Sequence, residues 1–307
     1  MSMSASNRVF TTTSPQGLRQ ELPPMRLWHK AKKLGVWDPA DIDFRQDAED
    51  WQRMTDGQRR ALTRQSSLFL AGEESVTLDL LPLILTVARE GRIEEEMYLT
   101  SFLWEEAKHV DGFRRFFDEV AHDHSDLSSW HGPSYRHLFY DELPSAMNRL
   151  LSDPSPAAQV RASVTYNMII EGVLAETGYY GYGRTLTENG LLPGMQRFVG
   201  LVKRDESRHL AFAVYFLSRL MAEHGDALWQ AFQERMNDLL PFTLGVVNDS
   251  YDDNPEGEEV PFNVEREEVL AYAMSQFQKR VNRIERARHQ TLEEVYQIAN
   301  SLDDEQA

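Results

Sequence analysis

Apolar residues recur three and four positions apart along most of the chain from Asp56 onward, which is the pattern of amphipathic helices. Short breaks rich in Gly, Pro, Asn and Asp separate segments of roughly 20 to 30 residues. Alternating runs of β-branched residues and Gly-rich phosphate loops are missing. The pattern therefore predicts an all-α chain, a bundle of long helices in one domain. The breaks lie at 90–91, 123–133, 153–156, 189–193, position 225 and 252–261.

The two ends of the chain differ from this body. Residues 1–22 are rich in Ser and Thr and lack periodicity, so we expect a flexible N-terminal tail. Residues 23–43, with Trp28 and Trp37, are expected to form an ordered, extended arm packed on the body. The predicted units are a tail (1–22), a single helical domain (23–295) and an acidic C-terminal tail (296–307), with a solvated acidic loop at 251–259.

Composition narrows the classes of partner. The 307 residues include 49 Asp and Glu against 32 Lys and Arg, a formal net charge of -17. Nucleic acids and anionic membranes bind basic surfaces, so neither is an expected partner. With no cysteine, the chain has no disulfide, zinc ribbon, iron–sulfur cluster or catalytic thiol, and a metal would need Asp, Glu and His. Neither a membrane span nor a secretory leader is recognisable, so we expect a cytoplasmic protein.

Several histidines follow a glutamate by three residues, a spacing that puts both side chains on one helix face and lets them hold one metal ion. The first and last pairs lie on otherwise apolar faces, where a charged group is costly unless it is paired or bound to a metal. The middle pair adjoins the polar residues 123–126 at a predicted helix end and is interpreted as a surface pair. The pairs are Glu106/His109, Glu119/His122 and Glu206/His209.

A further glutamate precedes each buried pair by about one helix-turn-helix, at Glu73 and Glu171. One Glu plus one Glu-x-x-His from each half is the inward-facing ligand set of dinuclear carboxylate bundles. Four carboxylates balance two divalent ions, and oxygen and imidazole donors suit iron and manganese. The candidate metal ligands are therefore Glu73, Glu106, His109, Glu171, Glu206 and His209.

Acidic residues beside the candidate ligands leave alternative assignments of the metal ligands. Glu106 is preferred because it lies three residues before His109, whereas its neighbour lies four before. Glu171 is preferred for its place in mid-helix, after an apolar run. Asp205 is either a hydrogen-bond acceptor for a ligand histidine or a surface acid. The rival acids are Glu74, Glu105 and Glu176.

This residue set resembles the ribonucleotide-reductase small-subunit superfamily within the ferritin-like fold, and more narrowly the ligand-binding oxidases related to that subunit. The resemblance spans about residues 23–290 and is strongest in Lys-Arg-Asp-Glu-Ser-Arg-His at 203–209. It implies a ferritin-like bundle with additional helices, a homodimer, and one manganese and one iron ion per chain, with two irons as the alternative. It places manganese with Glu73, Glu106 and His109, iron with Glu171, Glu206 and His209, and Glu106 as the bridge.

The same resemblance implies O2 activation beside a long-chain fatty acid, or another apolar small molecule, whose carboxylate reaches the metals from a hydrophobic tunnel. It also implies an ether cross-link between the oxygen of Tyr166 and the β-carbon of Val76. Val76 shares the helix face of Glu73. Tyr166 would point about 140° away from Glu171 in a regular α-helix, so we expect a π-bulge between them.

The small residues of segment 172–183 could open such a channel, or could serve close helix packing instead.

Other functions also remain as alternatives. A radical-storing ribonucleotide-reductase subunit is disfavoured because Phe113 stands four residues after His109, where many such subunits keep a tyrosine, and because residues 298–307 contain no tyrosine. A diiron acyl desaturase or hydroxylase would need a reductase partner. The non-enzyme alternative is an iron-binding ferritin relative. It is disfavoured because ferritin-type cages are built from much shorter chains.

Overall fold

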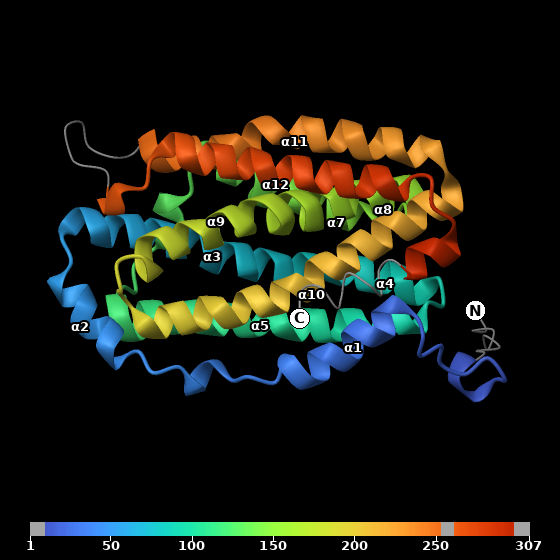
Figure 1. Cartoon of the computed structure of the whole chain (residues 1–307), viewed down its shortest axis with the longest axis horizontal. Helices are drawn as coiled ribbons and strands as arrows, with labels where there is room; N and C mark the ends of the chain where they lie inside the picture. Colours follow the sequence, from blue (N-terminus) through green and yellow to red (C-terminus); the bar gives the residue numbers. More distant parts are fainter. Residues whose placement is uncertain (1–9, 253–260, 298–307) are drawn as a thin grey trace, which may run out of the picture.

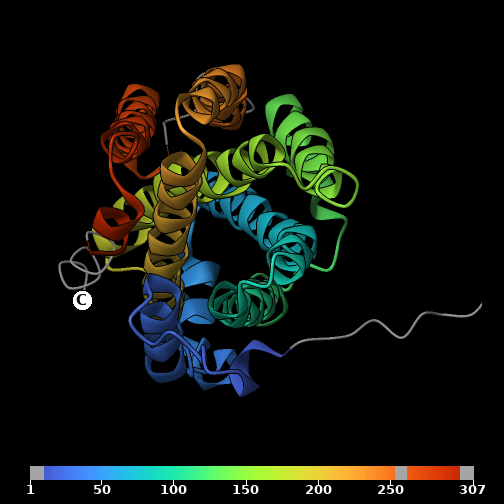
Figure 2. The same cartoon turned by 90° about the vertical axis from the view of Figure 1, so that its right-hand side faces the viewer.

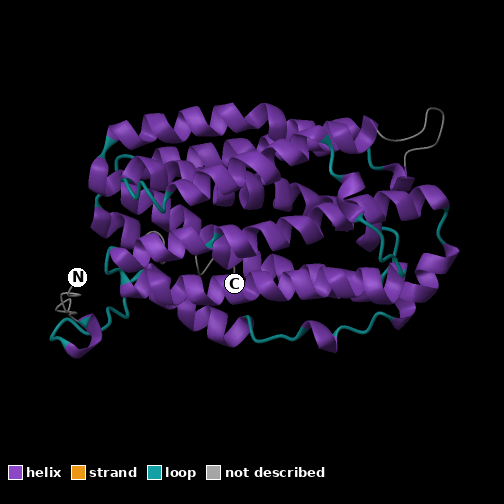
Figure 3. Cartoon of the chain, turned by 180° about the vertical axis from the view of Figure 1, so that it is seen from behind, coloured by secondary structure: helices purple, strands orange, loops and turns teal. Residues whose placement is uncertain are grey.

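The computed structural model describes residues 10–252 and 261–297. These residues form helices and connecting turns without a strand (Figure 3), which confirms the all-α prediction. None of the described helices combines the length and the hydropathy that a membrane crossing requires. Of the predicted tails (1–22 and 296–307) and the predicted acidic loop (251–259), residues 1–9, 298–307 and 253–259 lie outside the described residues.

Long helices make up most of the described structure, and several continue directly into π-helical turns. The α-helices are α1 (Pro23–Leu34), α2 (Arg45–Arg53), α3 (Asp56–Asp79), α4 (Leu81–Arg89), α5 (Ile93–Phe116), α6 (Pro133–Arg136), α7 (Leu143–Arg149), α8 (Pro156–Ser163), α9 (Glu176–Tyr182), α10 (Pro193–His224), α11 (Asp226–Asp252) and α12 (Arg266–Ala287). The π-helices are η3 (Phe117–Ala121), η5 (His137–Glu142), η6 (Val164–Ala175) and η7 (Gly183–Thr187). Short 3-10 turns are η1 (Thr11–Thr13), η2 (Pro39–Asp41), η4 (Leu127–Trp130) and η8 (Pro261–Asn263).

Four elements surround the interior of the bundle: α3, α5, α10 and the continuous helical stretch from α8 through η7. They run along the long axis in Figure 1 and enclose the centre in the end view of Figure 2. Helices α11 and α12 lie outside this ring against η6, and α1 lies on the opposite side, against α5 and α10. The ring therefore brings both halves of the chain to one core.

Side-chain caps, one local and one from a distant helix, mark where two of these ring helices begin. At α3, the Thr55 hydroxyl accepts from the Gln58 backbone N–H and the Gln58 side chain accepts from the Thr55 N–H, which forms a capping box. At α10, the Asp47 carboxylate accepts from the backbone N–H groups of Gly194 and Met195 at 2.8 and 2.7 Å. A carboxylate at a helix N-terminus satisfies free N–H groups and the helix dipole, so Asp47 ties α2 to α10.

The prediction of an extended arm at 23–43 is wrong for its first half. Residues Pro23–Leu34 form α1, in which Leu27 and Ala31 are one turn apart and buried against the body. Two adjacent prolines begin this helix, and proline is favoured in the first turn, where no N–H partner is needed. The connection that follows α1 is not a long helix and carries Trp37 toward the core.

Candidate metal centre

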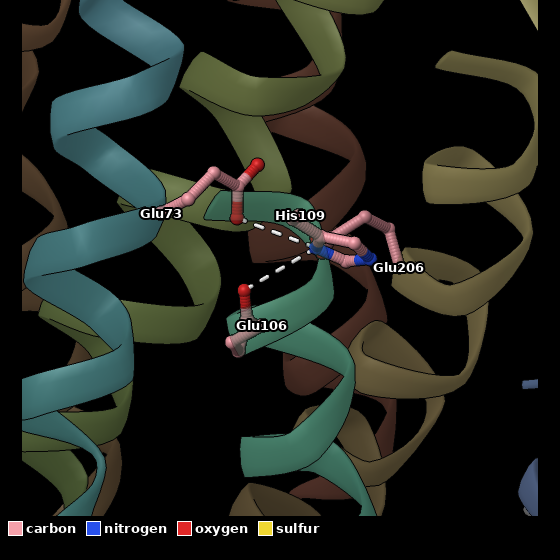
Figure 4. A group of neighbouring side chains, drawn as sticks. All are labelled: Glu73, Glu106, His109 and Glu206. Atoms are coloured by element: carbon pink, nitrogen blue, oxygen red, sulfur yellow. Dashed lines mark hydrogen bonds and ion pairs between the residues drawn. The ribbon is translucent and has the colours of Figure 1, made fainter. Parts of the chain in front are cut away.

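The six predicted ligand side chains come together at the centre of the ring. They form two overlapping groups, and within each group one donor atom per residue lies within 4.8 Å of all the others. Figure 4 shows the first group, with Glu73 from α3, Glu106 and His109 from α5, and Glu206 from α10. The groups are Glu73, Glu106, His109 and Glu206, and Glu106, Glu171, Glu206 and His209, all of them buried.

Two carboxylates belong to both groups. The resemblance led us to expect sharing only for Glu106, and the structure adds Glu206. The two oxygens of Glu106 face different histidines, at 3.5 Å from His109 Nδ1 and 3.2 Å from His209 Nδ1. Those of Glu206 do the same, at 3.4 and 3.3 Å. Sequence spacing could not show this, because sharing depends on how closely α5 and α10 approach each other.

The outermost glutamates differ in their distance from the histidines. Glu73 Oε2 lies 3.3 Å from His109 Nδ1 and is hydrogen-bonded to it. Glu171 Oε1 lies 4.0 Å from His209 Nδ1. Glu73 comes from the regular helix α3, whereas Glu171 comes from the π-helix η6.

The inward donor atoms fit a bound metal pair. Buried polar atoms normally have hydrogen-bond partners, yet among the described residues several inward atoms of this cluster have none. Carboxylate oxygens and an imidazole nitrogen facing one another are hard and borderline donors that suit Mn and Fe. The atoms are Glu106 Oε1 and Oε2, Glu171 Oε1, Glu206 Oε2 and His209 Nδ1.

Proton affinities in the cluster reflect the concentration of buried charge. Burial raises the pKa of Glu73 and of Glu171 well above the ordinary range. Burial alone would lower the pKa of His109 and His209, but the adjacent carboxylates outweigh it and raise both well above the ordinary value. Burial would raise the pKa of Glu106, but its contacts with the two histidines hold it below its usual range. Without metal, the cluster therefore retains protons that a divalent cation would displace.

The outward nitrogen of each histidine faces an acid from the other motif. His209 Nε2 lies 2.9 Å from Glu105 Oε2, and His109 Nε2 lies 3.5 Å from Asp205 Oδ2. One guanidinium nitrogen, Arg208 Nη2, donates to both acids. The structure thus buries Asp205 beside a candidate ligand histidine instead of exposing it, and gives Glu105, treated above as a rival ligand, the corresponding place behind His209. An acid behind a ligand histidine fixes its orientation and tautomer.

Asp205 has further partners. Trp37 Nε1 donates to Asp205 Oδ2 at 2.8 Å, and Lys108 Nζ donates to the same oxygen at 3.1 Å and to the Gly35 carbonyl at 2.6 Å. Sequence reasoning missed Trp37 and Lys108 at the centre. The one sequence signal was the position of Lys108, directly before His109 in a helical segment that otherwise faces the core.

The other acids lie apart from the cluster. Glu74 is exposed and Glu176 is half-buried. The pair at the end of α5 is separate as predicted: His122 follows η3 with a left-handed φ of 51° and contacts the Asp118 carbonyl, while Glu119 accepts from Arg115. Neither Glu119 nor His122 belongs to a metal-binding group among the described residues.

Tyr166 and Val76 face each other across the core, from η6 and α3. Both are buried, and the Tyr166 hydroxyl donates to the Val76 carbonyl at 3.4 Å. The expected π-bulge between Tyr166 and Glu171 is present and larger than a single turn, because η6 runs from Val164 to Ala175. A π-helix turns less per residue than an α-helix, so Tyr166 and Glu171 both point inward.

A cavity of about 230 Å³ extends from the carboxylates toward the end of the bundle where α3 begins and α11 ends. Its inner end is lined by the four clustered glutamates. Between the two ends its walls are mainly apolar, with Leu68, Phe69, Val76, Ile170, Leu174 and Val246. From segment 172–183, Gly178 and Gly181 also line it, in agreement with the channel interpretation, whereas Gly172 packs against Arg280.

Comparisons with known proteins agree with this geometry. The family model for the ribonucleotide reductase small chain matches residues 23–288. A solved R2-like ligand-binding oxidase with an aerobically reconstituted Mn/Fe cofactor is 36% identical, with a TM-score of 0.85 over 89% of this chain and 96% of that chain. A valine-to-isoleucine variant of such an oxidase, anaerobically reconstituted with Mn/Fe, is 35% identical, with a TM-score of 0.87 over 91% of this chain and 99% of that chain.

Proposed function

The chain belongs to the ribonucleotide reductase small-chain family and is a metal-dependent oxidoreductase of ferritin-like fold, and from this premise we propose that it is a dinuclear Mn/Fe oxidase acting beside a bound fatty acid. The observation that carries the proposal is the pair of overlapping, buried ligand groups with unpartnered inward atoms. Enzyme family membership argues against an iron-storage protein.

The metal positions follow from the two groups. Glu73 and His109 would hold one ion and Glu171 and His209 the other, with Glu106 and Glu206 between them. Manganese at the first position and iron at the second is the arrangement that the family resemblance implies, and two irons are the alternative. When bound, such a pair supplies the reduction of O2 coupled to the oxidation of a nearby bond.

A long-chain fatty acid fits the chemistry of the cavity. Its carboxylate would lie at the inner end beside the metals, and its alkyl chain would follow the walls formed by Phe69, Ile170 and Leu174. Two wall hydroxyls, Thr177 and Thr185, donate to backbone carbonyls of their own helix, so they present little polarity to an alkyl chain. An apolar cavity with a polar inner end is what an amphipathic ligand requires.

The oxidation that these residues themselves would undergo is an ether cross-link. The bond would join the Tyr166 oxygen to the Val76 β-carbon, with loss of one hydrogen from each and transfer of two electrons and two protons to O2. Support comes from the burial of both residues, the hydrogen bond from the Tyr166 hydroxyl to the Val76 backbone carbonyl, and the π-helix that turns Tyr166 inward. Solved structures of the related oxidases include valine and tyrosine variants.

We also propose a homodimer, which light scattering would test.

A peptide map by mass spectrometry tests the function. The metal-free chain would be loaded anaerobically with Mn(II) and Fe(II) and exposed to air, with an unloaded sample and a Tyr166→Phe variant as controls. We expect a species that joins the Val76 and Tyr166 peptides and is lighter by two hydrogens than their sum, in the loaded wild type alone. Separate, unmodified peptides from fully metal-loaded protein would instead favour a radical-storing subunit or a desaturase-like enzyme.

A further inference from the structure

The two outermost glutamates of the centre are held in different ways. Glu73 has one oxygen in contact with His109. Glu171 directs Oε1 toward the cluster, where it has no hydrogen-bond partner among the described residues, and its Oε2 accepts a hydrogen bond from Asn167 Nδ2 at 2.9 Å. One oxygen of Glu171 is therefore engaged in a hydrogen bond within the protein.

Asn167 is itself held in this orientation. The Ser163 hydroxyl donates to Asn167 Oδ1 at 2.8 Å, so the amide nitrogen is the atom turned to Glu171. Ser163, Asn167 and Glu171 are exposed by 0%, 1% and 4%, and they follow one another at intervals of four residues from the end of α8 into η6. A buried chain of directed hydrogen bonds restrains its side chains to a single arrangement.

Among the described residues, no such chain supports the other half of the centre. The residues four and eight positions before Glu73 on α3 are Phe69 and Gln65. Phe69 cannot donate a hydrogen bond, and its ring stacks with Phe113 and Tyr179. Gln65 donates to the Gly178 carbonyl, away from Glu73. The difference between the halves is therefore already present in the residue types.

We infer that Asn167, held by Ser163, is a positioning residue that makes Glu171 a single-oxygen ligand of the metal position beside His209. The inference rests on the proposed metal-binding function. Because the amide N–H stabilises charge on Oε2, it disfavours rotation of that oxygen onto the metal. The two positions would then differ, because a single-oxygen Glu171 leaves a coordination place beside His209 for a ligand from the cavity, whose inner end all four glutamates line.

A double-mutant cycle tests the inference by Mn(II) binding alone. Anaerobic Mn(II) dissociation constants, measured from the EPR signal of free Mn(II), would be compared for Asn167→Ala in two backgrounds. Glu73→Ala leaves the position beside His209, and Glu171→Ala leaves the position beside His109. Loss of a partner that orients a ligand typically weakens metal binding about 10–100-fold. We expect at least a tenfold weakening in the Glu73→Ala background and less than a twofold change in the Glu171→Ala background.

Controls separate positioning from general stability. Thr165 is buried on the same π-helix, but its hydroxyl donates to the Arg161 carbonyl and accepts from Arg235. Thr165→Val should lower the unfolding midpoint without changing either dissociation constant. Ser163→Ala should give a smaller effect than Asn167→Ala in the same background, because the amide donor remains.

The outcomes are distinguishable. If Asn167→Ala weakens binding equally in both backgrounds, or in neither, the inference is overturned while the metal-binding function stands. If the wild-type chain binds no Mn(II), both are overturned. A crystal structure of the Mn(II)-loaded wild type with both Glu171 oxygens on the metal would also contradict the inference.

Discussion

The α3–α5 half and the η6–α10 half of the centre have the same pattern of residue types and different surroundings. Each supplies one Glu and one Glu-x-x-His. In the first half the elements are regular α-helices and Glu73 contacts His109 directly, whereas in the second a π-helix carries Glu171 and Asn167 restrains it. The motif thus determines which side chains are ligands, and the neighbouring residues determine how each ligand is oriented.

The acids behind the histidines also differ. Asp205, behind His109, accepts from Trp37, Lys108 and Arg208. Glu105, behind His209, has Arg208 as its one Lys or Arg partner within hydrogen-bond distance among the described residues, besides His209 itself. The first half is therefore supported by several donors and the second depends on one guanidinium, which gives the comparison measurable consequences.

The largest expected effect concerns the shared carboxylates. Glu106→Ala and Glu206→Ala each remove a donor from both groups and should abolish binding of both ions, whereas Glu73→Ala and Glu171→Ala should each leave one. Metal content after anaerobic loading with Mn(II) and Fe(II), measured by mass spectrometry, would show this. Glu119→Ala, in the surface pair, is the matched control and should retain two. Two tightly bound ions in Glu73→Ala would show that our ligand set is wrong.

The next effect concerns the cations between the acids. Arg208→Met removes the guanidinium that Glu105 and Asp205 share, leaves Glu105 with His209 alone, and should lower the free energy of unfolding by about 3–5 kcal/mol. Lys108→Met should cost less, about 1.5–3 kcal/mol, because Asp205 retains Arg208 and Trp37. Urea unfolding of the metal-free chain gives both values. Arg114→Met, which removes a partly exposed pair with Asp118, is the control, at under about 1 kcal/mol. Equal losses for Arg208 and Lys108 would contradict the difference between the halves.

The stability of the metal-free chain should depend on pH because of groups in both halves of the centre. The pKa of Glu73, Glu171, His109 and His209 is raised in the folded chain, so the folded state holds more protons than the unfolded state above the ordinary values of 4.5 for Glu and 6.5 for His. Stability of the metal-free chain should then fall as pH rises beyond these values, by about 1.4 kcal/mol per pH unit for each extra proton. The lowered pKa of Asp205 acts in the opposite direction, but only at acidic pH.

Urea unfolding between pH 6.5 and 8.5 measures this slope. Metal binding displaces the protons, so Mn(II) affinity should rise over the same interval. His109→Gln and His209→Gln should each reduce the slope, which tests whether both halves hold protons. A metal-free stability that stays constant across the interval would contradict the assigned directions.

The smallest effect is confined to the first half. Trp37→Phe removes one hydrogen bond to Asp205 and should cost about 1 kcal/mol of stability. Mn(II) binding should weaken slightly in the Glu171→Ala background, which leaves the position beside His109, and stay unchanged in the Glu73→Ala background. A larger change beside His209 would show that the two halves are coupled more strongly than their contacts indicate.

Residue spacing together with the apolar character of the helix faces was enough to find the six side chains that meet in the core, and to separate the surface pair Glu119/His122 from them. The reason is that a spacing of three along a helix fixes two side chains to one face, and the apolar neighbours show which face is buried. The helical class followed from the same periodicity. The helix α1 was missed, although the two prolines at its start are typical of the first turn of a helix.

What the sequence determined by itself was the helical class and the donor types on each buried face, because both depend on contacts within one turn of helix. What only the tertiary structure decided was the sharing of Glu206, the pairing of Glu105 with His209 and Asp205 with His109, and the extent of η6. These depend on the separation and rotation of α5, α10 and η6, which many side chains set together through packing and no single spacing along the chain encodes.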